Sequence, residues 1–138
     1  MFEFPNGLPK RIALIAVALF FLVAGVSHFT NPQFFVAIVP PYLPAAVALV
    51  SISGVFEILG GLGVLPSATR RAAGWGLLVL LVAVYPANIH MALHPEQFPE
   101  MSRNALIVRL PLQFVFMAWV WWATQPDRKG DTTNDAIH

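Results

Sequence analysis

Four long stretches of apolar residues, separated by short polar or proline-rich segments, dominate the sequence. They cover residues 12–28, 44–65, 72–93 and 104–124. A helix rises about 1.5 Å per residue, so about 20 apolar residues can cross a hydrocarbon core about 30 Å thick. The pattern therefore predicts an all-α fold. We expect an integral membrane, antiparallel four-helix bundle in which residues 1–124 form a single transmembrane domain.

The segment between the first two predicted spans favours a short helix. Thr30 or Asn31 can cap a helix that has Pro32 in its first turn, and the prolines at 40 and 41 would end it. About eight residues are too few to cross a membrane. Its aromatic and aliphatic residues indicate an interfacial helix that covers one mouth of the bundle. A plain apolar connection is the alternative.

The composition narrows the class of protein. Hydrophobic residues make up 57% of the chain and charged residues 11%, whereas an ordinary soluble domain has about 25% charged residues. The net charge of +1 and the lack of a basic stripe argue against a nucleic-acid partner. Cysteine is absent, which excludes disulfides and thiolate chemistry within this chain. The first apolar stretch resembles a signal peptide, but the three that follow favour a retained span.

The basic residues predict the orientation of the chain. With four spans, the N-terminus, the turn after the second span and the tail share one side. Those segments hold Lys10, Arg11, Arg70, Arg71, Arg128 and Lys129. The opposite loops hold only Arg103, so the positive-inside rule places both termini in the cytoplasm. The polar residues 125–138 are expected to form a disordered cytoplasmic tail.

One acidic residue stands inside the second predicted span. Glu57 is the only charge between residues 51 and 65, and a charge at the membrane centre costs roughly 2.5–3.5 kcal/mol on insertion scales. Its side chain should therefore face protein or trapped water. Small residues lie three or four positions to either side, on the same helical face, namely Ser53, Gly54, Gly60 and Gly61. This face is expected to pack closely against neighbouring helices.

The other unusual polar residues are predicted to gather in the outward half of the bundle. They are His28, Asn88, His90, Arg109 and Gln113. From the depth of each residue counted along its helix, a direct ion pair between Glu57 and Arg109 is possible but stretched. Gln113 or a water could bridge them. Two interpretations stay open. One is an outward-facing polar cavity that holds a ligand head group or relays a proton, and the other is a structural hydrogen-bond network that fixes helix packing.

Other candidate sites are weaker. His90 and His94 are four residues apart, but Pro95 disturbs the geometry and no third ligand is fixed, so no metal site is predicted. Asn88 and His90 are two apart, so only one of them, Asn88, is expected to face the bundle centre. The tryptophans that end the fourth span indicate an interfacial belt. No phosphate-binding loop or nucleophile–base motif is present.

Several motifs together resemble the DoxX family of small four-span membrane proteins. They are GVSHF at 25–29, IVPPYLP at 38–44, ISGVFEILGGLGVL at 52–65, YPANIHMA at 85–92 and RLPLQ at 109–113. The resemblance implies a four-helix bundle in the bacterial cytoplasmic (inner) membrane. It also implies an association with oxidoreductase systems, some of them quinone-linked. The residues corresponding to Glu57, Asn88 and Arg109 look like the polar signature of that family.

Two functions follow as hypotheses. The first is a non-catalytic membrane subunit or binding module, with Glu57, Arg109, Asn88, Gln113, His28 and His90 around a lipid-like ligand or a partner helix. The second is a membrane subunit of a quinone-linked oxidoreductase, in which another subunit supplies the electrons. Neither requires a covalent cofactor or makes the chain an enzyme on its own. Expected partners are the bilayer, a membrane or redox protein, and a second copy of the chain. A small transporter is a third reading and would require oligomerisation.

Overall fold

The computed structural model describes residues 3–127, and every regular element in that range is helical. The elements are α1 (Leu8–Thr30), α2 (Pro32–Ile38), α3 (Ala46–Gly63), α4 (Ser67–Leu93), the 3₁₀ turn η1 (Pro95–Gln97) and α5 (Arg103–Thr124). The helices α1, α3, α4 and α5 are each long and apolar enough to cross a membrane. Many large apolar side chains point outward, which water would penalise and lipid would not. The chain therefore has the features of a multi-pass membrane protein.

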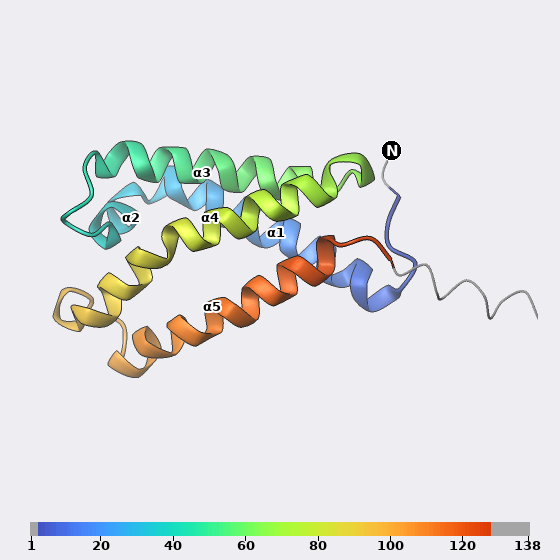
Figure 1. Ribbon diagram of the computed structural model, residues 1–138. Coiled ribbons are helices and arrows are strands. Elements are labelled where there is room, and N and C mark those ends of the chain that lie inside the picture. The colour runs from blue at the N-terminus through green and yellow to red at the C-terminus, as the bar shows by residue number, and fades with distance from the viewer. Residues whose placement is uncertain (1–2, 128–138) are drawn as a thin grey trace, which may run out of the picture.

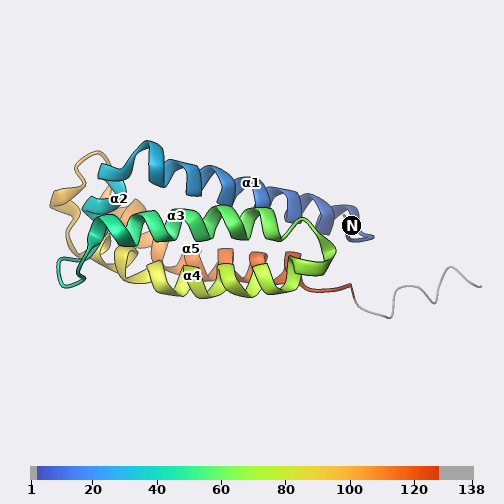
Figure 2. The same ribbon diagram turned by 90° about the horizontal axis from the view of Figure 1, so that it is seen from above.

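The four long helices lie side by side, and their connecting loops gather at the two ends of the molecule (Figure 1). The helix α1 packs most extensively on α3, and α4 packs mainly on α5 and α3 (Figure 2). The short helix α2 packs against α1, α3 and α4. It follows Asn31 and ends before Pro40, as its flanking residues predicted.

Two helix starts differ from the sequence prediction by more than two residues. The helix α1 begins at Leu8 rather than residue 12, because Pro9 fits a first helical turn and Lys10 and Arg11 continue it. The pair Arg70 and Arg71 was expected in a turn but lies within α4. Pro66 precedes that helix, and residues 67–71 contain no proline or glycine that would end its first turn.

The interior is divided along the length of the molecule. The half nearer the two termini holds a continuous apolar core, which consists of Leu14, Val17, Ala18, Phe21, Val64, Leu77, Leu78, Leu81, Val120 and Ala123. The far end holds a smaller apolar cluster of Met91, Phe98 and Leu106, with Phe34 and Ile38 of α2 packed against it. The buried polar side chains His28, Glu57 and His90 lie outside both clusters.

The described chain ends close to where it begins. Residues 125–127 follow α5 and contact the segment before α1 through Asp127. The predicted tail continues through residues 128–138, which lie outside the described residues.

Candidate functional site

The carboxyl group of Glu57 faces the imidazole of His28. Oε2 of Glu57, on α3, lies 3.1 Å from Nδ1 of His28, on α1. Each residue exposes only 8% of its surface. Two helices that are far apart in the sequence thus bring an acid and a base together inside the bundle.

Two glycines allow this approach. A Cβ atom on Gly54 would lie 2.8 Å from Cβ of His28, and a Cβ atom on Gly25 would lie 2.8 Å from the carbonyl oxygen of Gly54. Real Cβ atoms do not come this close to such neighbours, so α1 and α3 can meet at this distance only because both positions lack a side chain. Glu57 and His28 each lie three residues after one of these glycines. They therefore flank the point of closest contact.

The short helix α2 fixes the other side of the imidazole. The ring of Phe35 stacks on the ring of His28, with centroids 3.9 Å apart and planes 18° apart. Stacking restricts the ring orientation of His28. The helix α2 therefore contributes to the site as well as covering the end of the bundle.

The carboxyl group of Glu57 is incompletely satisfied. Nδ1 of His28 also lies 2.8 Å from the carbonyl oxygen of Ala24, one turn earlier on α1. One N–H at this nitrogen can serve the carbonyl or the carboxyl group, but not both at good geometry. Oε2 of Glu57 is buried and makes no directed hydrogen bond to any residue within the described range. An unsatisfied acceptor of this kind is costly, so the site can accept a further donor.

A second polar group joins α4 to α5. Asn88 donates from Nδ2 to Oε1 of Gln113, and Gln113 donates from Nε2 to the carbonyl oxygen of Leu81. Nη2 of Arg109 donates to Oδ1 of Asn88 at 3.3 Å. Each amide is used at both its oxygen and its nitrogen. The two amides are thus satisfied within the protein, in contrast to the carboxyl group of Glu57.

The polar residues that were predicted to lie together therefore form two separate groups. Arg109 is bonded to Asn88, and no ion pair joins it to Glu57 within 4 Å in the described structure. The partner of Glu57 is His28, which sequence reasoning included in the site without pairing it to Glu57. The shared spacing of Gly25 to His28 and Gly54 to Glu57 is a signal that could have found the pair.

His90 belongs to neither group. It exposes only 6% of its surface, and its ring lies 4.5 Å from the ring of His94. The prediction that only Asn88 of the two would turn inward was therefore wrong for His90. The helix α4 is contacted by α2 and η1 as well as by α3 and α5, so more than one of its faces is covered by protein. No group of three or more metal-ligating side chains occurs in residues 3–127.

Residues 17–124 match the family model described as Domain of unknown function (DUF8561). The chain belongs to this family. The match includes all six predicted site residues, from His28 to Gln113. Comparison with curated proteins and with solved structures finds no match.

Two clefts on the described part of this DUF8561 chain lie away from Glu57 and Arg109, which line neither of them. An apolar groove of about 590 Å³ lies between α1 and α5, and Phe20, Ala24 and Trp119 are among the residues that line it. A polar cleft of about 710 Å³ lies at the end of the molecule that carries both termini. Ala24 links the groove to the site, because its carbonyl oxygen is the one that contacts His28.

Proposed function

We propose that this protein is a non-catalytic membrane subunit or binding module. In this proposal, Glu57 and His28 bind the polar end of a lipid-like ligand. The observation that carries the proposal is Oε2 of Glu57, which is buried beside an imidazole and lacks a directed hydrogen bond within the described residues. Ionisable groups inside membrane-spanning segments are costly and usually serve function. In the described residues, Glu57 lies beside His28, and its Oε2 atom lacks a directed hydrogen bond that would satisfy it.

The apolar groove supports a ligand with a long apolar part. Its lining residues Leu19, Phe20 and Val23 face outward from α1, and Trp119 of α5 forms part of the opposite wall. Ala24 lies at this groove and also contacts His28 through its carbonyl oxygen. An acyl or isoprenoid chain in the groove would thus have its polar end near the acid–imidazole pair. A partner helix is the alternative occupant of the groove.

The setting that we propose is an antiparallel four-helix bundle in the bacterial cytoplasmic membrane, with α2 in the interface and both termini in the cytoplasm. The basic residues at the terminal end and the exposed Trp121 and Trp122 support this placement. Because the chain has no cysteine, single cysteines at the exposed Ala68 and Gln97 can be labelled selectively. Labelling of Gln97→Cys from the cytoplasmic side would overturn the orientation.

A quinone-linked oxidoreductase subunit is the second candidate. The DoxX-like motifs and the pairing of a carboxyl group with an imidazole favour it, because both groups can hydrogen-bond a quinone carbonyl or hydroxyl. A quinone is one member of the lipid-like class proposed above. A separate subunit would have to supply the electrons, and Glu57 would move protons.

The substitution Glu57→Gln tests the proposal because it keeps the shape of the side chain and removes its charge. We expect the melting temperature in detergent to stay nearly unchanged. Stabilisation by an added short-chain quinone or by the native lipid extract should be lost. Glu100→Gln, an exposed change outside the helices, is the matched control. It should leave both quantities unchanged.

A purely structural Glu57 would give the opposite pattern. The substitution would then lower the unfolding free energy by about 3–5 kcal/mol, as expected when one partner of a buried pair is removed. Ligand-induced stabilisation would persist in whatever protein remained folded. Separate measurement of stability and ligand response on the same variant distinguishes the two roles.

A further inference from the structure

A polar cleft of about 710 Å³ lies at the end of the molecule where the chain begins and its described part ends. Three segments line it: the residues before α1, the start of α4 and the residues that follow α5. It lies far along the helices from Glu57, beyond the apolar core. It therefore has no part in the function proposed above.

Two arginines of α4 line the cleft in different ways. Arg70 is held in place, because its Nε donates to the carbonyl oxygen of Val64 at 2.9 Å and its Nη2 donates to that of Leu65 at 2.7 Å. A guanidinium group has five N–H donors, so Arg70 keeps others for a further acceptor. Arg71 is exposed and makes no hydrogen bond or ion pair within residues 3–127. The guanidinium group of Arg70 is thus held in place, whereas that of Arg71 has no partner within residues 3–127.

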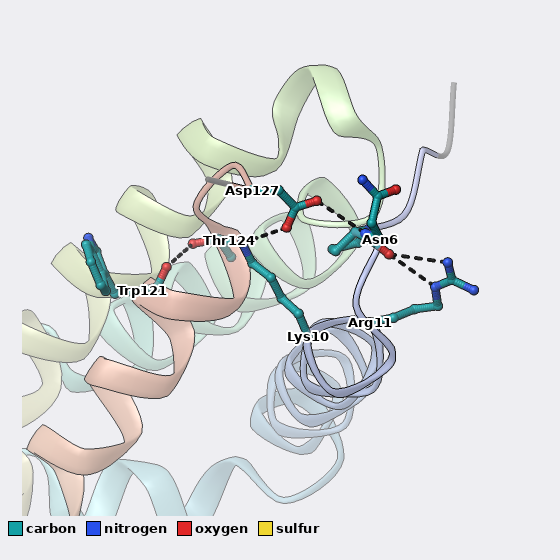
Figure 3. Close-up of polar contacts among 7 residues, drawn as sticks. Asn6, Lys10, Arg11, Trp121, Thr124 and Asp127 are labelled. Atoms are coloured by element: carbon teal, nitrogen blue, oxygen red, sulfur yellow. Dashed lines mark hydrogen bonds and ion pairs between the residues drawn. The ribbon is translucent and has the colours of Figure 1, made fainter. Parts of the chain in front are cut away.

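The carboxylate of Asp127 does not fill this role for Arg71. Its Oδ2 accepts from the backbone N–H of Asn6 and its Oδ1 lies against Nζ of Lys10, both at 3.2 Å (Figure 3). The pKa of this carboxyl is lowered, first by the Asn6 hydrogen bond and then by Lys10, while its slight burial acts in the opposite direction. Asp127 is therefore an anion that already has its own partners. Glu3 is exposed at the cleft and makes no ion pair within 4 Å in residues 3–127.

A donor on the opposite wall also lacks an acceptor. Nε2 of Gln125 is buried and makes no hydrogen bond to the part of the chain that the structure describes. Gln125 lines the same cleft as Arg70 and Arg71. The cleft thus contains donors from α4 and from the residues after α5. Asp127 is held by Lys10 and Asn6, and Asp127 and Glu3 also attract Arg70 through space, which leaves Arg71 as the cation without a partner in residues 3–127.

The position of the cleft indicates the source of an anion. Trp121 and Trp122 lie in the last turn of α5, beside the cleft, and both are exposed. Tryptophans at a span end lie at the level of lipid headgroups. At the level of the lipid headgroups, the hydrogen-bond acceptor that the bilayer supplies to an arginine is a phosphate ester. Arginine clusters in this position attract anionic lipids.

We propose that this cleft binds the headgroup phosphate of an anionic phospholipid through Arg71 and Arg70. The two guanidinium groups donate charge-assisted hydrogen bonds to the phosphate oxygens. Arg71 is the residue to change, because Arg70 also closes the end of α3. Bound lipid should tie the start of α4 to the ends of the chain.

The test measures the melting temperature of the full chain in a zwitterionic detergent. The probe is added phosphatidylglycerol, and phosphatidylcholine and inorganic phosphate are tested separately. Phosphatidylglycerol should raise the melting temperature of the wild-type protein, and phosphatidylcholine should not. In Arg71→Gln, the lipid concentration needed for half of the effect should rise about tenfold or more, the usual loss for one charge-assisted hydrogen bond. Arg103→Gln removes the same charge at the other end of the molecule and should respond like the wild type.

Four results would overturn the proposal. One is an equal response of Arg71→Gln and the wild-type protein to phosphatidylglycerol. Another is no response of the wild-type protein to this lipid. The third is an equal response to phosphatidylcholine, whose phosphate is balanced by a choline cation, because it would show that the cleft does not select an anionic headgroup. Stabilisation by inorganic phosphate alone, lost in Arg71→Gln, would identify a free phosphate as the ligand and exclude the lipid. Because Arg71 is exposed and has no partner in the described range, its substitution should not impair folding.

Discussion

The helix pair α1 and α3 and the helix pair α4 and α5 are held together by different means. Glycines let the backbones of α1 and α3 approach until Gly25 and Gly54 nearly touch. Side-chain amides bridge α4 and α5, where Asn88 and Gln113 bond to each other. The first interface depends on the absence of side chains, and the second depends on long polar ones.

The polar groups of the two pairs differ in the same way. Asn88 and Gln113 use the oxygen and the nitrogen of both amides within the protein. Oε2 of Glu57 has a nearby imidazole but no directed hydrogen bond within the described residues. A satisfied network rigidifies a bundle, whereas an unsatisfied buried acid keeps capacity for something else. The comparison therefore assigns the structural role to the network between α4 and α5, and the candidate binding role to Glu57 and His28.

The largest loss of stability is expected when a side chain is added at the contact between Gly25 and Gly54. Gly54→Leu places a branched side chain against His28 and Phe29, where even a Cβ atom is too close. The helices α1 and α3 must separate, which should lower the unfolding free energy by about 1–3 kcal/mol or more. Thermal unfolding in detergent measures this, and the quinone or lipid response should also disappear. Gly76→Leu is the control, because a Cβ atom there meets nothing within 4 Å. Equal melting temperatures for the two variants would show that α1 and α3 do not meet at Gly54.

A smaller loss of stability is expected when the hydrogen bonds between α4 and α5 are removed. Gln113→Leu keeps most of the side-chain volume but removes the bonds to Asn88 and to the carbonyl oxygen of Leu81. Hydrogen bonds between membrane helices contribute about 1 kcal/mol, so stability should fall by about that amount. A double-mutant cycle with Asn88→Ala should show that the two losses are coupled. Asn104→Leu, an exposed change on the same helix, should cost little.

The same variant, Gln113→Leu, tests whether the network between α4 and α5 takes part in ligand binding. The ligand response of Gln113→Leu should match that of the wild-type protein, since neither Gln113 nor Asn88 contacts Glu57 through a hydrogen bond. A lost ligand response without a loss of stability would move the binding role to the network between α4 and α5.

The smallest loss of stability is expected when the contact between Asp127 and Lys10 is removed, at the end of the molecule that carries both termini. Asp127, just after α5, pairs with Lys10 of α1 and with the backbone of Asn6. An exposed pair of this kind contributes about 0–1 kcal/mol. Because folding lowers the pKa of Asp127, the contribution is present at pH values above the carboxyl's ordinary range and is lost as the pH falls through the lowered folded-state value.

The pH dependence can be isolated with one variant. Asp127→Asn should remove this pair, so the stability difference from the wild-type protein should vanish at acidic pH and be present at neutral pH. Glu96→Gln removes an exposed carboxyl at the other end of the molecule, away from this contact, and is the control variant. A difference that grew on acidification would contradict the assigned contact.

The sequence alone determined the four long helices, because each needs only a sufficient length of apolar residues. It also determined the face of α3 that packs against the protein, although Ser53 and Gly60, which were predicted on that face, are only half-buried. Gly54, Glu57 and Gly61 share one helical stripe and are all buried, as the 3.6-residue period requires.

Only the tertiary structure decided which polar residues meet. Depth along a helix follows from counting residues, but it leaves open the rotation of each helix and the choice of its neighbours. Arg109 was therefore a reasonable partner for Glu57 by depth, yet its rotation directs it to Asn88. His28 reaches Glu57 because Gly25 and Gly54 bring α1 and α3 into close contact, and Phe35 reaches His28 because α2 folds back over them. Such pairings depend on how side chains from several helices fill one space, which no single stretch of sequence specifies.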